Sequence, residues 1–164
     1  MTVDDLLATE EIRALSATYM RGLDRLDRQV LRSVFHDDAR TDYGFYQGGP
    51  DGFVDMAYHA LASHHSNHHL LGQILVTLDG ERAQGEVYFQ AYHRVVDNGR
   101  AEDLFIAGRY VDRYEKRDGV WKIAFRAELN DWARTEEAAD DFFRRQPKAL
   151  RGARAPDDLS CSRV

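Results

Sequence analysis

The sequence predicts an α+β fold in which N-terminal helices cover one face of a curved antiparallel sheet. Apolar residues recur at three- and four-residue steps in the first third of the chain, which is typical of amphipathic helices. From His69 onward the apolar period changes to two, and short Gly-containing connections separate the expected strands. A strongly bent sheet with helices across its concave face forms a cone, whose interior is a natural small-molecule pocket.

Three helices are expected before the sheet. The first covers about residues 4–26, the second residues 29–35, and the third begins after Asp51 as N-cap and ends near His64. Residues 39–45 are expected to form a short strand between the second and third helices. The apolar stripe of the first helix consists of Ile12, Leu15, Tyr19, Leu23 and Leu26.

Four long strands follow, over residues 69–78, 82–96, 104–117 and 120–132. Their connections are rich in Gly, Asn and Asp, which tolerate the positive φ angles of tight hairpin turns. The three connections are Asp79-Gly80, Asp97-Asn98-Gly99 and Asp118-Gly119. Consecutive hairpins give an antiparallel sheet, and the N-terminal helices then cover one of its faces.

The C-terminal part is expected to be less regular. Residues 135–145 predict a further amphipathic helix with Phe142 and Phe143 as its apolar anchors. We assign residues 1–146 to a single domain, because 164 residues suffice for one sizeable core but not for two. Residues 147–164 have the composition of a loose tail.

Composition excludes several classes of function. A net charge of -6 argues against a nucleic-acid partner, because phosphate contacts need a basic patch. No apolar run is long enough to span a bilayer, and the acidic N-terminus is unlike a signal peptide, so we expect a cytoplasmic protein without a membrane partner. The single cysteine, Cys161, excludes disulfides and thiolate-rich metal sites.

Asp24 and His69 are the leading candidates for chemistry. Asp24 lies near the end of the first helix, and His69 stands where a helical stretch gives way to a long strand. In this fold class both positions border the expected pocket, where a carboxylate would fix the tautomer of a histidine that transfers protons. The alternative is that both are ordinary surface polar residues.

Four histidines in six positions raise the question of a metal site. The pairs His64/His68 and His65/His69 have the i,i+4 spacing with which helical histidines bind zinc. A catalytic zinc site needs a third ligand, and no metalloprotease-type motif supplies one, so we expect no metal. No P-loop or dinucleotide fingerprint is present, so we also expect no cofactor.

Three further residues could assist the pair. Alternation along its strand predicts that His93 faces inward, toward the cavity or simply into the core. Arg126 would orient an anionic oxygen if it pointed inward and would form an ordinary salt bridge if it pointed outward. Tyr19 lies five residues before Asp24, roughly 140° around a regular helix, so the two share a pocket only if it wraps around the helix end.

Taken in order along residues 7–134, several motifs resemble those of the SnoaL-like branch of the nuclear-transport-factor-2-like (NTF2-like) superfamily. The motifs are Glu11-Ile12-x-x-Leu15, Tyr19-x4-Asp24, Phe35-x-Asp37-Asp38-Ala39, the strand start at His69, Leu78-Asp79-Gly80-Glu81-Arg82-Ala83, Ala91-Tyr92-His93-Arg94, and Arg113-Tyr114-Glu115 with Gly119-Val120-Trp121-Lys122-Ile123. The family includes dehydratases and dehydrochlorinases that act as cofactor-independent lyases. The resemblance therefore implies an NTF2-like cone and a lyase.

The resemblance also implies roles for individual residues. His69 corresponds to the catalytic base and Asp24 to the carboxylate that orients it. Tyr19, Arg126 and His93 correspond to groups that stabilise an enolate or phenolate oxygen or protonate a departing hydroxyl, although the dehydrochlorinases carry a lysine at the Tyr19 position. The implied reaction is loss of water or retro-aldol cleavage of a carbon–carbon bond.

The implied substrate is a hydrophobic, aromatic or polycyclic hydroxylated small molecule, and the implied assembly is a homo-oligomer, with a trimer favoured. Two other readings remain open. The same pocket could hold an isomerase or a cyclase, whose chemistry does not need the Asp24–His69 pair. The fold also serves as a non-catalytic ligand-binding module or structural subunit.

Overall fold

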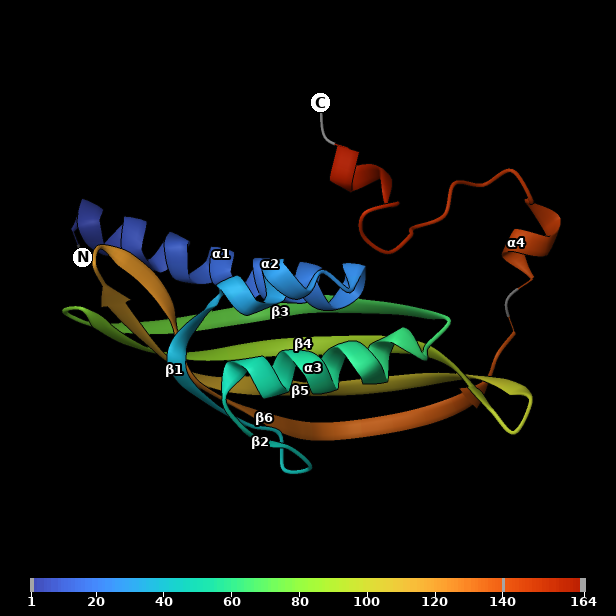
Figure 1. Cartoon of the computed structure of the whole chain (residues 1–164), viewed down its shortest axis with the longest axis horizontal. Helices are drawn as coiled ribbons and strands as arrows, with labels where there is room; N and C mark the ends of the chain where they lie inside the picture. The colour runs from blue at the N-terminus through green and yellow to red at the C-terminus, as the bar shows by residue number, and fades with distance from the viewer. Residues whose placement is uncertain (1, 140, 163–164) are drawn as a thin grey trace.

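The computed structural model describes residues 2–139 and 141–162 and has the predicted α+β architecture. One curved sheet has the strand order β2 (Gln47–Gly48), β1 (Phe35–Asp42), β6 (Val120–Glu137), β5 (Arg100–Arg117), β4 (Arg82–Asp97) and β3 (Ser66–Asp79). The helices α1 (Val3–Arg25), α2 (Arg28–Ser33) and α3 (Pro50–Ala62) lie across the same face of this sheet (Figure 1). The sheet is open, because β2 and β3 form its two edges without pairing to each other.

Both ends of α1 are fixed by local interactions. Thr2 forms a capping box with Asp5, in which the Thr2 hydroxyl accepts from the Asp5 amide and the Asp5 carboxylate accepts from the Thr2 amide. Leu26 ends the helix with a φ of 51°. Near this end, Gly22 approaches Leu31 of α2 so closely that an added Cβ would lie 2.8 Å from the Leu31 backbone. The close packing of α2 therefore fixes the part of α1 that carries Asp24.

The second helix is shorter than predicted, and the first strand begins earlier. α2 ends at Ser33, and Phe35, which we had placed at the end of that helix, opens β1 (Phe35–Asp42). The reason is tertiary pairing, because β1 runs parallel to β6 with Phe35 opposite Ile123 and Thr41 opposite Arg126. A strand was therefore correctly predicted in this region, but it begins at Phe35, four residues before the predicted start at residue 39.

The predicted N-cap of the third helix is wrong. The N-cap of α3 is Gly49, and Pro50 occupies the first helical position, where its fixed φ and missing N–H are tolerated. The carboxylate of Asp51 instead accepts a hydrogen bond from Arg32 Nε at 2.5 Å. A two-residue strand, β2 (Gln47–Gly48), precedes the helix and pairs with β1.

The four hairpin-linked strands are confirmed. They are β3 (Ser66–Asp79), β4 (Arg82–Asp97), β5 (Arg100–Arg117) and β6 (Val120–Glu137), each antiparallel to the next. Positive φ angles at Asn98-Gly99 and Asp118-Gly119 give both turns the geometry that hairpins favour. The strands are longer than predicted, because neighbouring strands continue to pair beyond the apolar runs.

The helix predicted over residues 135–145 is wrong over most of its length. Thr135 pairs with Leu104, and Glu137 pairs with Glu102, so β6 continues where a helix was expected. Continued pairing with the long β5 outweighs the helical preference expected for residues 135–137. Only α4 (Phe142–Arg145) is helical, and residue 140 lies outside the described residues.

The core lies between the helices and the inner face of the sheet. Alternate residues of the strands point inward, and the residues that pack there include Ile12, Tyr19, Phe35, Phe53, Val87, Phe89, Tyr110, Tyr114, Trp121 and Ile123. Within the described residues, no helix has the length and apolar content needed to cross a membrane.

Part of the predicted tail makes specific contacts with α1. The Ala155 amide donates to the Arg25 carbonyl at 2.7 Å, and Arg21 Nη1 donates to the Ser160 hydroxyl at 2.9 Å. A short 3₁₀ helix, η1 (Leu159–Ser162), ends the described chain, and residues 163–164 lie outside it. The division into a domain and a loose tail stays a prediction.

Candidate active site

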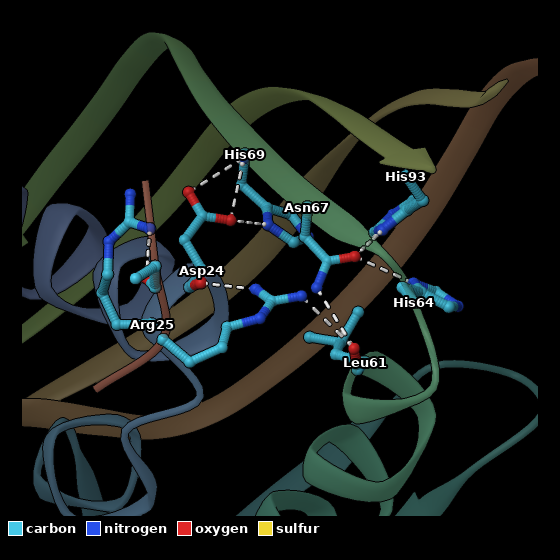
Figure 2. A network of polar contacts seen from close by, with 9 residues as sticks. Asp24, Arg25, Leu61, His64, Asn67, His69 and His93 are labelled. Atoms are coloured by element: carbon cyan, nitrogen blue, oxygen red, sulfur yellow. Dashed lines mark hydrogen bonds and ion pairs between the residues drawn. The ribbon is translucent and has the colours of Figure 1, made fainter. Parts of the chain in front are cut away.

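Asp24 and His69 meet where the C-terminal turn of α1 crosses the start of β3. The Asp24 Oδ1 atom lies 2.7 Å from His69 Nδ1. The backbone N–H of His69 donates to both carboxylate oxygens of Asp24, at 3.1 Å each (Figure 2). The carboxylate therefore holds both the ring and the backbone of His69.

This geometry assigns the tautomer of His69. A carboxylate accepts hydrogen bonds, so Nδ1 carries the proton and Nε2 keeps a lone pair. The side chains of His69 and Asp24 are 6% and 10% exposed, respectively. The histidine therefore does not point to bulk solvent, and its free nitrogen is a proton acceptor inside the fold.

Two more histidines surround this pair. His93 projects from β4 on the inner face, as its alternation predicts, and its ring centroid lies 5.2 Å from that of His69. His64, in the connection between α3 and β3, lies 5.0 Å from His93 by the same measure. The Nδ1 atoms of His64 and His93 both contact the side-chain amide of Asn67, at 2.8 and 2.9 Å.

The amide of Asn67 can take two orientations related by a half-turn. In Figure 2 its oxygen faces His64 and His93, and its nitrogen faces the Leu61 carbonyl. In the rotated orientation the nitrogen donates to both Nδ1 atoms, and the oxygen accepts from Arg154 Nη2 at 2.7 Å and Nη1 at 3.1 Å. We adopt the rotated orientation, because it pairs every donor with an acceptor.

The rotated amide determines the proton positions on His93. Because Nδ1 accepts from Asn67, the neutral ring carries its proton on Nε2. Burial, together with the nearby His69 and His64, lowers the pKa of His93 to about 3. His93 is therefore a neutral hydrogen-bond donor at ordinary pH.

Arg126 and Tyr19 lie in a second cluster, which also contains Asp112. Arg126 Nε and Nη2 donate to the two carboxylate oxygens of Asp112 at 2.8 and 2.7 Å, and neither side chain has any exposed surface. The guanidinium lies 4.2 Å from the ring centroids of both Tyr19 and Tyr110. Burial opposes its charge, but Asp112 holds the pKa of Arg126 well above its ordinary value.

Tyr19 is closed off by its neighbours. Its ring is 1% exposed, and its hydroxyl forms a 2.7 Å hydrogen bond with the hydroxyl of Tyr43. Burial raises the pKa of Tyr19 above its ordinary value. Arg126 Nη1, by contrast, has no hydrogen-bond partner among the described residues, so this cluster keeps one open donor.

Sequence reasoning missed three residues near the pair. Glu128 lies on the inner face of β6 opposite Tyr110, and burial raises the pKa of its carboxyl group. Its position two residues after Arg126 was a usable signal, because residues i and i+2 of a strand share a face. Asn67 and Arg154 gave no such signal, because their contacts depend on the path of the C-terminal segment.

The histidine pairs considered for zinc do not form a site in the described part of the chain. β3 begins at Ser66, so His68 and His69 point to opposite faces of the sheet. No group of three or more His, Cys, Asp or Glu side chains among the described residues could hold a metal ion.

A cleft of about 360 Å³ opens beside the histidine cluster, between the start of β3, the end of β4 and the C-terminal segment. Asn67 and Arg154 form part of its wall and also contact the cluster. Arg25, Arg94 and Arg151 line the remainder together with His65 and His68. The cleft therefore adjoins the site through the same two residues that organise it.

The amino-acid sequence matches one protein family and several characterised proteins. Residues 4–127 match the family described as "SnoaL-like domain". Hexachlorocyclohexane dehydrochlorinase 1 from Sphingobium indicum (strain B90A) is 28% identical over 127 residues, which cover 74% of this chain and 80% of that protein. Gamma-hexachlorocyclohexane dehydrochlorinase from the UT26 strain of the same species is 27% identical over 129 residues, 76% of this chain and 81% of that protein.

Solved structures share the fold. A hexachlorocyclohexane dehydrochlorinase of LinA type 2 superposes with a TM-score of 0.76 at 23% identity, covering 84% of this chain and 94% of that chain. The LinA-type3 enzyme from Novosphingobium barchaimii LL02 gives the same TM-score at 22% identity, covering 84% and 95%.

Proposed function

Because this chain belongs to the SnoaL-like domain family, we propose that it is a cofactor-independent lyase that eliminates a small leaving group from a hydrophobic small molecule. The observation that carries the proposal is the 2.7 Å contact between Asp24 Oδ1 and His69 Nδ1, while the second ring nitrogen has no hydrogen-bond partner among the described residues. A carboxylate that orients a histidine in this way is the arrangement of a general base.

The proposed reaction begins at His69 Nε2, which removes a proton from a substrate carbon. The electron pair of the broken C–H bond forms a carbon–carbon double bond, and the leaving group departs from the adjacent carbon with its bonding electrons. Asp24 stabilises the imidazolium that forms, and His93 Nε2–H donates to the leaving group or to a developing oxyanion. Later transfer of the proton from His69 to the leaving group or to water regenerates the base.

Tyr19 and Arg126 have less direct roles in this proposal. Tyr19 is buried against Tyr43, and two of the Arg126 nitrogens are held by Asp112, so both residues are occupied within the second cluster. Only Arg126 Nη1 retains a free donor for a substrate oxygen. That Arg126 and Tyr19 are catalytic stays a prediction, and in the proposed reaction Arg126 would contact the substrate through Nη1.

The leaving group follows from the same chemistry. Water and chloride fit the elimination described above, in which His69 removes a proton from carbon and the group leaves from the adjacent carbon. In a retro-aldol step His69 would instead remove the proton of a substrate hydroxyl, so that formaldehyde leaves as the carbon–carbon bond breaks and its electron pair forms an enolate. The names of the sequence relatives support chloride as a further candidate, because those proteins are dehydrochlorinases. The named compound of those relatives, hexachlorocyclohexane, supports a hydrophobic substrate.

The test is incubation of the purified, metal-chelated protein with a panel of hydroxylated aromatic, steroid-like and chlorinated cyclic compounds, followed by mass spectrometry. Loss of water, formaldehyde or hydrogen chloride supports the lyase and identifies the leaving group. A conversion without change of mass would instead establish the isomerase or cyclase, and binding without conversion would establish a ligand-binding module.

We also propose that the chain forms a homo-oligomer through the outer face of the sheet, with a trimer favoured. Leu70 and Trp132 lie in one cross-strand row on that face, and Leu75 and Val111 lie in another, separated from the first by the row that contains Tyr88 and Arg109. All four apolar side chains are exposed in the single chain. An apolar surface of this kind is typical of an interface, and light scattering after size-exclusion chromatography tests it: a monomer at micromolar concentration would contradict the proposal.

A further inference from the structure

Arg154 reaches the site from the C-terminal segment, 130 residues away from Asp24 in the sequence. Its Nη1 donates to the backbone carbonyl of Asp24 at 2.6 Å, and its Nη2 lies 3.5 Å from the carbonyl of Leu61. The same two nitrogens donate to the rotated amide oxygen of Asn67. One guanidinium therefore joins the end of α1, the end of α3 and the start of β3.

The residues on both sides of Arg154 are held independently of its side chain. The Ala155 amide donates to the Arg25 carbonyl, and Arg25 Nη1 donates to the Ala153 carbonyl at 2.9 Å. The Ala153 amide donates to Asp158 Oδ2 at 2.8 Å. These hydrogen bonds fix the backbone on both sides of Arg154, so its side chain extends to the site from a segment of defined position.

We propose that Arg154 is a positioning residue that orients the amide of Asn67 and thereby holds His93 as the neutral Nε2–H donor beside His69. This inference rests on the proposed lyase function for its purpose, but its geometry concerns only this chain's own residues. The Asn67 oxygen is engaged by Arg154, so the amide nitrogen must face the Nδ1 atoms of His93 and His64.

The surroundings of His93 explain why this orientation has an effect. The charged and titratable groups that act on His93 are His69, His64, Asp24 and Arg154, which come from β3, the α3–β3 connection, α1 and the C-terminal segment. An amide N–H directed at Nδ1 disfavours a proton there, because the two donors would face each other. The positive charge of Arg154 acts in the same direction.

Arg154 achieves this without competing for the dyad carboxylate. It donates to the backbone oxygen of Asp24, so both carboxylate oxygens stay with His69. An arginine bound to the Asp24 carboxylate itself would partly neutralise the negative charge that stabilises the His69 imidazolium. The arrangement thus controls His93 while leaving the Asp24–His69 pair intact.

The test is a ¹⁵N NMR titration of the histidine rings in the full-length protein and in Arg154→Met. The expected wild-type spectrum has an unprotonated Nδ1 on His93 at neutral pH, and the variant is expected to raise the His93 pKa by about one unit or more. Arg151→Met is the matched control, because Arg151 lies three residues away and stacks on Phe143 without touching Asn67.

Two results would overturn the inference: a protonated Nδ1 on wild-type His93, or a His93 pKa that moves equally in Arg154→Met and Arg151→Met. The wild-type spectrum provides the first result even if Arg154→Met does not fold. Arg154→Lys keeps the charge but loses the paired donation, and we expect it to shift the His93 pKa in the same direction as Arg154→Met, though less.

The NMR result is independent of turnover. If no compound in the panel is converted, the proposed function fails while the tautomer of His93 can still be as expected. If turnover is found but Arg154→Met leaves His93 unchanged, the lyase stands and the positioning role of Arg154 fails.

Discussion

His69 and Arg126 both project from the inner face of the sheet, and each is held by an aspartate, yet the two clusters are built differently. Asp112 accepts hydrogen bonds from two nitrogens of Arg126, and the guanidinium packs against the rings of Tyr19 and Tyr110. The side chains of Arg126 and Asp112 are fully buried. Asp24 engages only Nδ1 of the His69 ring, and Nε2 has no hydrogen-bond partner in the part of the chain that the structure describes.

The difference separates an ion pair that stabilises from one that can react. The Arg126–Asp112 pair satisfies most of its own hydrogen-bonding capacity, so removal of one partner mainly leaves a buried charge. In the Asp24–His69 pair, the carboxylate orients the His69 ring through Nδ1, and Nε2 can still accept a proton. We therefore expect substitutions in the two clusters to affect different measurements, activity in one and stability in the other.

The largest expected effect is on catalysis by Asp24→Asn. The asparagine amide can donate to Nδ1, which would move the ring proton of His69 to Nε2 and remove the base, so kcat/KM should fall by about 10²–10⁴-fold. Its oxygen can still accept from the His69 backbone N–H, so urea unfolding should show a small change in stability. Unchanged kcat/KM on a substrate found in the panel would refute the role of Asp24.

Arg126→Met should act mainly on stability. Asp112 would be left buried and unpaired, which costs about 3–5 kcal/mol of unfolding free energy. The double variant Arg126→Met/Asp112→Leu removes both charges and should recover much of this loss in chemical denaturation. A large fall in kcat at unchanged stability would instead show that Arg126 Nη1 serves the substrate.

The buried neutral His93 makes stability depend on pH. Its folded pKa of about 3 lies below the ordinary value of 6.5, so the unfolded chain binds the proton first as the pH falls. The free energy of unfolding should therefore decrease from pH 6.5 toward pH 3, by at most about 1.4 kcal/mol per pH unit from this group. His93→Gln should flatten that part of the profile, and an identical slope in the variant would contradict the assignment.

Tyr19→Phe should have the smallest effect. It removes the hydroxyl that bonds to Tyr43 and keeps the ring against Arg126, so we expect a loss of about 0.5–1.5 kcal/mol in stability. Activity should stay within a few-fold of wild type. A fall comparable with that of Asp24→Asn would place the Tyr19 hydroxyl in the reaction.

Much of the fold could be predicted, because its signals are local. The change of apolar period at the start of β3 and the turns at Asn98-Gly99 and Asp118-Gly119 each depend on neighbouring residues. The errors at Phe35, Asp51 and residues 135–137 have another origin. There, pairing with a distant strand or a salt bridge to Arg32 outweighed the local preference.

Part of the candidate site could also be predicted from the sequence. Position at the helix end and strand start was enough to select Asp24 and His69, and alternation placed His93 on the same face. Asn67 and Arg154 could not be selected, because only the folded C-terminal segment brings Arg154 to the site. Arg126 and Tyr19 were selected together and do lie together, but the sequence did not indicate that Asp112 would occupy the guanidinium.

The most direct test of the dyad is turnover by His69→Ala, measured beside the wild type with the best substrate from the panel. The variant should keep its fold by circular dichroism and thermal unfolding and lose kcat/KM by at least the factor expected for a general base, about 10²–10⁴-fold. Turnover at the wild-type rate in a folded His69→Ala would contradict the account, because no other histidine among the described residues is hydrogen-bonded to a carboxylate.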